Sequence, residues 1–76
     1  MPKLPLVSGD QAVKAFKKLG YKVVRQKGSH MRMHHLFDKS KNPLTIPRHR
    51  MLGKGLIRKL LRDAKITPED FVNLLK

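Results

Sequence analysis

Apolar residues near the start of the chain recur with the spacing of a helix. The repeated face comprises Ala12, Val13, Phe16 and Leu19. Before it, Ser8 and Gln11 match a capping box, in which each side chain can bond the other residue's backbone N–H. After it, Gly20 suits the left-handed conformation that often ends a helix. The pattern predicts a helix over residues 9–19.

The middle of the chain changes to the two-residue period of β-strands. Residues 21–26 are rich in β-formers and stop at a Gly28-Ser29 turn signal, where glycine can take positive φ. From there one set of alternating residues is more apolar and should face the helices: Met31, Met33, His35 and Phe37. The other set should lie on an open face: His30, Arg32, His34 and Leu36. Residues 44–46 predict a third short strand that ends at Pro47.

The last third of the chain returns to helical spacing. Residues 48–55 form a basic loop with two glycines. The helical face that follows comprises Leu56, Ile57, Leu60, Leu61 and Ala64. Thr67 and Pro68 begin a final short helix, whose apolar stripe consists of Phe71, Leu74 and Leu75. The order α-β-β-β-α-α with short links predicts an α+β fold, in which helices cover one face of a three-stranded antiparallel sheet.

Length and composition narrow the class of protein. With 76 residues we expect one domain spanning residues 1–76. The chain has no cysteine, which excludes disulfides and thiolate sites. No apolar run approaches the roughly 18 residues that a membrane span needs. Residues 1–7 lack the apolar core of a signal peptide. We therefore expect a cytoplasmic protein without a membrane partner.

Charge is the strongest compositional signal. Lys and Arg number 18 against 5 Asp and Glu, a net charge of +13. Residues 11–37 contain seven bases and no acid, and residues 39–62 contain eight bases and no acid. Such a field attracts polyanions. Because these bases are not gathered on one amphipathic helix, nucleic acid is a better partner than a membrane surface.

Several kinds of catalytic or metal site do not fit the sequence. On one strand, His30 and His34 would stand ~13 Å apart, which is too far for a shared zinc ion. Ser29 adjoins His30, but no acid lies nearby in sequence to orient the imidazole, so Ser29 is better explained as a turn hydroxyl. Residues 53–55 lack the spacing of a phosphate-binding Walker loop. We expect no metal and no other cofactor.

Acid–base chemistry on a bound polyanion remains possible. RNA carries its own nucleophile, the 2′-hydroxyl, so cleavage needs only a base, cations on the phosphate and an acid for the leaving oxygen. His30 stands close in sequence to Arg25, Lys27 and Arg32. Cations beside a histidine favour the neutral imidazole, which is the form that acts as a base.

An ordered set of motifs resembles the HicA (YcfA-like) mRNA interferase toxins. The set consists of Gly20-Tyr21, Arg25-Gln26-Lys27-Gly28-Ser29-His30, Pro47-Arg48-His49 and Lys54-Gly55. The resemblance implies a fold like the double-stranded-RNA-binding domain and metal-independent cleavage of mRNA. It also implies inhibition by a HicB-type antitoxin. We expect a monomer alone and a hetero-oligomer with that antitoxin.

The resemblance also implies site residues. The family's catalytic histidine corresponds to His30, as general base or acid. Arg25, Lys27 and Arg48 would clamp phosphate. The full set of expected RNA-binding residues is Arg25, Lys27, Gly28, Ser29, Arg32, Arg48, His49 and Lys54. Two alternatives stay open: an RNA-binding module of the same fold without catalysis, and a helix-turn-helix over residues 56–76 that reads DNA.

Overall fold

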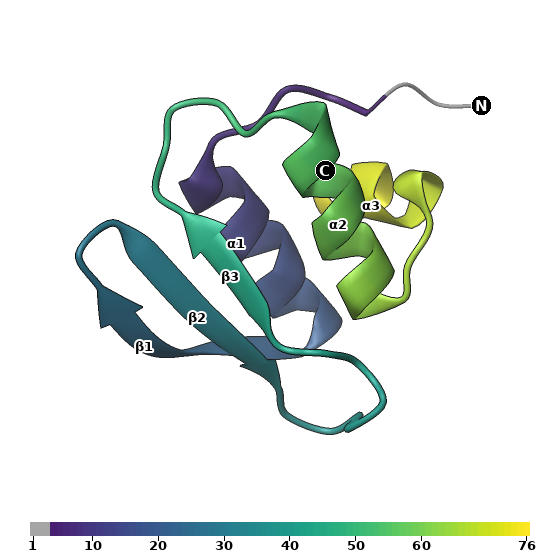
Figure 1. Ribbon diagram of the computed structural model, residues 1–76. Helices are drawn as coiled ribbons and strands as arrows, with labels where there is room; N and C mark the ends of the chain where they lie inside the picture. The colour runs from purple at the N-terminus through teal and green to yellow at the C-terminus, as the bar shows by residue number, and fades with distance from the viewer. Residues whose placement is uncertain (1–3) are drawn as a thin grey trace.

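The computed structural model describes residues 4–76, and it contains the six predicted elements in the predicted order (Figure 1). These are α1 (Gly9–Leu19), β1 (Tyr21–Lys27), β2 (His30–His35), β3 (Leu44–Pro47), α2 (Lys54–Ala64) and α3 (Pro68–Leu74). Residues 1–3 lie outside the described residues. They belong to the opening segment 1–7, which we expect not to be a signal peptide.

The three strands form one antiparallel sheet in the order β1-β2-β3, with β2 in the centre. The helices lie on one side of it (Figure 1). Met31, Met33, Leu44 and Ile46 point to that side and are buried. The residues between them on β2 and β3 are exposed. The predicted fold class is therefore confirmed, and the other face of the sheet is open.

Helix α1 forms where its caps and apolar face predicted. Ser8 Oγ accepts from the Gln11 backbone N–H at 3.1 Å, and the Gln11 side chain accepts from the Ser8 backbone at 2.9 Å. Gly20 ends the helix with φ of 113°. The buried Phe16 ring packs edge-on against Tyr21, at 5.9 Å between ring centres. The cap at Gly20 ends α1, and the contact between Phe16 and Tyr21 packs the start of β1 against it.

Helices α2 and α3 place their apolar faces in the same core. Ile57, Leu60, Leu61 and Phe71 are all buried. Helix α2 begins at Lys54, two residues before the predicted apolar face, and its N-cap Gly53 supplies no side-chain bond. In α3 the capping box pairs Thr67 with Asp70. The apolar stripes of both helices are thus part of the core shared with the sheet.

One expectation about β2 is wrong. Phe37, which we expected to face the helices, is 83% exposed. The strand ends at His35 because the imidazole Nδ1 accepts from the backbone N–H groups of Phe37, at 3.2 Å, and Asp38, at 2.9 Å. The chain bends there, so the alternation no longer applies. The other ring nitrogen of His35 donates to the Leu19 carbonyl at 2.9 Å, which ties the end of β2 to the end of α1.

No helix among residues 4–76 is long and apolar enough to cross a membrane.

Candidate nucleic-acid interface

The β1–β2 hairpin turn sets the position of His30. Gly28 has φ of 59°, as expected for the glycine of a two-residue turn. Lys27 and His30 are opposite each other on the two strands that flank the turn. The Ser29 carbonyl accepts from the Arg48 backbone N–H at 2.6 Å, which joins the turn to the loop after β3. His30 is thus exposed. The turn before it is held by the pairing of β1 with β2 and by the hydrogen bond to the loop after β3.

A bulge in β1 determines which cations share the face of His30. Val23 pairs with Met33, but the next pair is Arg25 with Arg32, so Val24 is the extra residue. Strand residues alternate between faces, and a bulge shifts that alternation by one. Without the bulge, Arg25 and Lys27 would follow Val23 toward the helices. With the bulge, both lie on the open face.

Five residues line a shallow depression on this open face, which we name the histidine hollow. They are Arg25, Lys27, His30, Arg32 and Thr45. The Arg32 guanidinium donates to Thr45 Oγ1 at 2.9 Å, so the neighbouring strand holds one of the cations. Four of the residues expected to act on RNA therefore meet at one place. Thr45 was not among the expected site residues, although its position between the buried Leu44 and Ile46 already predicts exposure on this face.

Other predicted site residues lie elsewhere. The Arg48 side chain points to α1, where its Nε is 3.3 Å from the Asp10 carboxylate. His49 is exposed in the following loop, and its carbonyl accepts from the Gly9 backbone at 2.9 Å. Lys54 is the exposed first residue of α2. None of these three side chains lines the histidine hollow.

The histidines do not form a metal site. Within residues 4–76 no three His, Cys, Asp or Glu side chains are grouped closely enough to hold a metal ion. His34 shares the open face with His30, whereas His35 is bonded to backbone groups on the other side. The donor set of the open face is cationic, which suits an anion instead.

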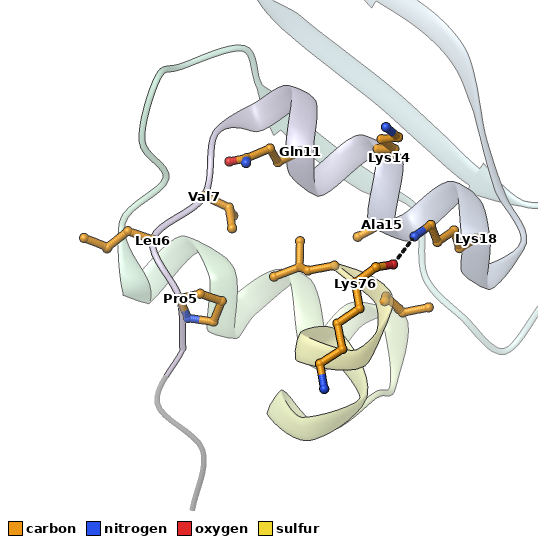
Figure 2. A pocket seen from close by; sticks show the side chains of 10 residues that line it. Pro5, Leu6, Val7, Gln11, Lys14, Ala15, Lys18 and Lys76 are labelled. Carbon is orange, nitrogen blue, oxygen red and sulfur yellow. Dashed lines mark hydrogen bonds between the residues drawn. The ribbon is translucent and has the colours of Figure 1, made fainter.

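Two further grooves lie beside α1. One, lined by α1, residues 5–7 and residues 74–76, is shown in Figure 2. There Lys18 Nζ donates to the Lys76 carbonyl at 2.7 Å. Its lining residues include no histidine and no acidic side chain. The other runs between α1 and the β1–β2 hairpin and contains the Arg48–Asp10 pair. Neither groove is lined by a histidine, whereas the histidine hollow combines one with three cations.

Fold and site together define a small basic α+β domain that presents a histidine and three cations on an uncovered sheet face. The positive field of such an arrangement attracts polyanions. A protein-family model, described as the HicA toxin of bacterial toxin–antitoxin systems, matches residues 9–66 of the sequence. The chain belongs to the HicA toxin family.

This membership covers α1, the whole sheet and α2. It implies an antitoxin partner, since the family consists of the toxins of toxin–antitoxin pairs. A comparison with curated proteins finds no matching sequence.

Proposed function

We propose that this protein is a metal-independent endoribonuclease toxin that cleaves mRNA in the cytoplasm with His30 as its acid–base residue. The observation that carries the proposal is the histidine hollow, where His30 adjoins Arg25, Lys27 and Arg32 on an open face. Family membership supports the same assignment.

The chemistry follows from the groups in the hollow. The three cations hold the phosphate and offset the charge that develops on it. The His30 imidazole takes the proton of the 2′-hydroxyl, whose oxygen attacks phosphorus as the bond to the 5′ oxygen breaks. Guanidinium groups do not give up protons in proteins, so Lys27 is the cation suited to protonate the leaving oxygen. The products are a 2′,3′-cyclic phosphate and a 5′-hydroxyl.

The remaining predicted RNA contacts fit around this centre. Gly28 and Ser29 bring the turn close to the phosphate, while His49 and Lys54 would meet RNA beyond the hollow. Arg48 acts as a phosphate clamp only when its ion pair with Asp10 opens. Both side chains are more than half exposed, at 55% and 65%. Exposed pairs of this kind are typically worth less than about 1 kcal/mol, so RNA can displace Asp10.

We also propose that a HicB-type antitoxin inhibits the protein by covering the open face. The free toxin is then a monomer and the inhibited form a hetero-oligomer.

The test replaces His30 with alanine and compares it with His34→Ala. His34 lies on the same strand and the same open face, but ~13 Å away. His30→Ala should lower RNA cleavage by about 10²- to 10⁴-fold, as expected for loss of a general acid–base group. His34→Ala should leave cleavage near the wild-type rate. Both are measured with purified protein and labelled RNA in the presence of a chelator.

Two results would overturn the assignment. One is unchanged cleavage by a folded His30→Ala variant, and the other is wild-type cleavage that appears only with added metal. The open basic face also suits a binding module without catalysis. In that case the wild-type protein would retain RNA with a steep salt dependence and yield no cleavage products.

A further inference from the structure

The open face does not end at the histidine hollow. A second depression, which we name the α2 hollow, lies between β3 and α2 and shares Arg32 and Thr45 with the first. Its other lining residues include Pro43, Leu56, Lys59 and Asp63. Arg32 is two residues from His30 along β2, or ~6.6 Å. An RNA strand bound at His30 therefore reaches the α2 hollow within a nucleotide or two.

Asp63 is unusual in this setting. It is a half-buried carboxylate in the last turn of α2, where a negative charge opposes the helix dipole. The ion pair found among residues 4–76 joins Arg48 to Asp10 and does not involve Asp63. A negative charge also repels the phosphates that the cations of this face attract. Lys59, four residues earlier on the same face of α2, offsets this charge only in part, because no ion pair joins the two side chains within residues 4–76. The Asp63 carboxylate is therefore available to a ligand in this hollow.

A carboxylate beside an RNA path can accept hydrogen bonds from a base. Adenine, cytosine and guanine each carry an exocyclic amino group, and unpaired RNA is read through such edges. Uracil has no amino group, and its one donor on that edge, N3–H, lies between two carbonyl oxygens that a carboxylate repels. Pro43 and Leu56 offer apolar surface to the face of a base, and the Lys59 ammonium suits its phosphate.

The geometry points to the α2 hollow as a base-selecting subsite, in which Asp63 accepts a hydrogen bond from an amino-bearing base and disfavours uracil. This inference rests on the proposed ribonuclease function and adds a specificity residue to it. Asparagine at position 63 would remove the selection, because its amide can both donate and accept.

The experiment sequences the RNA ends that the protein produces from a random-sequence library. With wild-type protein, uracil should be under-represented about tenfold at one position beside the cleaved bond. Asp63→Asn should reduce this bias to about twofold or less. Glu69→Gln is the matched control, because it removes the same charge from an exposed site at the start of α3. The control should keep the bias.

A binding measurement separates this inference from the ribonuclease proposal. Labelled cytidine and uridine hexanucleotides are bound to the His30→Ala variant, alone and combined with Asp63→Asn. Cytidine carries an amino group where uridine carries a carbonyl, and its N3 bears no hydrogen. Tighter binding of the cytidine hexamer that is lost with Asp63→Asn supports the subsite, even if the wild-type protein cuts no RNA. Equal binding of the two, or a cleavage bias unchanged in Asp63→Asn, overturns it.

Discussion

At the scale of single residues, Thr45 gives Arg32 a fixed place in the site. Its hydroxyl accepts from the guanidinium at 2.9 Å, and both side chains line the histidine hollow. A guanidinium that is already oriented loses less conformational freedom when it binds phosphate. In the proposed ribonuclease, Thr45 is thus a positioning residue, which acts on substrate through Arg32.

Thr45→Val should therefore raise KM for RNA by about 2- to 10-fold, with a smaller change in kcat. Thr45→Ser keeps the hydroxyl and should restore the wild-type KM. The measurement is steady-state cleavage of one RNA, with urea unfolding of each variant alongside. Because position 45 is exposed and valine is a good β-former, neither variant should lose more than about 0.5 kcal/mol. A KM raised equally in both variants would argue against the role of the hydroxyl.

At the scale of elements, the join between α1 and β1 depends on one glycine. Gly20 has φ of 113°, a conformation that side chains rarely adopt. A Cβ at this position would also lie 2.7 Å from His35 Nε2. That nitrogen bonds the Leu19 carbonyl, so a displaced imidazole would leave the end of β2 without its tie to α1.

Gly20→Ala should destabilise the protein by about 1–3 kcal/mol, from backbone strain and the displaced His35 ring. Gly55→Ala is the contrasting variant. Gly55 lies in the first turn of α2, and a Cβ there meets no atom within 4 Å. Alanine should stabilise that helix by up to about 1 kcal/mol. Urea unfolding followed by circular dichroism measures both, and a Gly20→Ala variant as stable as wild type would contradict the strain argument.

At the scale of the whole molecule, Tyr21 links α1 to the loop between β2 and β3. It is buried against Phe16 of α1, and its hydroxyl donates to the Asn42 carbonyl at 2.8 Å. Burial, and then the negative charges of Asp63 and Asp38, raise the pKa of Tyr21 to about 12. An exposed tyrosine in the unfolded chain has a pKa near ~10.

The stability that the raised pKa of Tyr21 gives the folded protein is present in full below pH ~10, because the hydroxyl is then protonated in both the folded and the unfolded chain. It is lost between pH ~10 and about 12, because the unfolded chain releases its proton first. Urea unfolding across this range should show the free energy of unfolding falling faster in wild type than in Tyr21→Phe. This variant is the control, because it lacks only the hydroxyl and contains the same lysines. Tyr21 is the only tyrosine, so its ultraviolet absorbance reports the pKa directly. A midpoint near ~10 in the folded protein would contradict the assignment.

The sequence alone was enough to predict the elements, their order and the apolar faces of the helices. Each depends on local periodicity and on caps such as Ser8 with Gln11 and Thr67 with Asp70, which involve near neighbours only. The exposure of His30 and Arg32 followed from the same alternation. The charge of +13 predicted a polyanion partner without any structure.

Tertiary structure decided which residues meet. The bulge at Val24 depends on pairing with β2, and it turns Arg25 and Lys27 to the face of His30. Thr45 reaches Arg32 only because β3 lies beside β2, and Arg48 turns to Asp10 because α1 passes next to its loop. Phe37 is exposed because His35 bonds the backbone that follows it. Periodicity records the neighbours along one element, whereas these contacts join segments distant in sequence, whose register is set only when the sheet and helices pack.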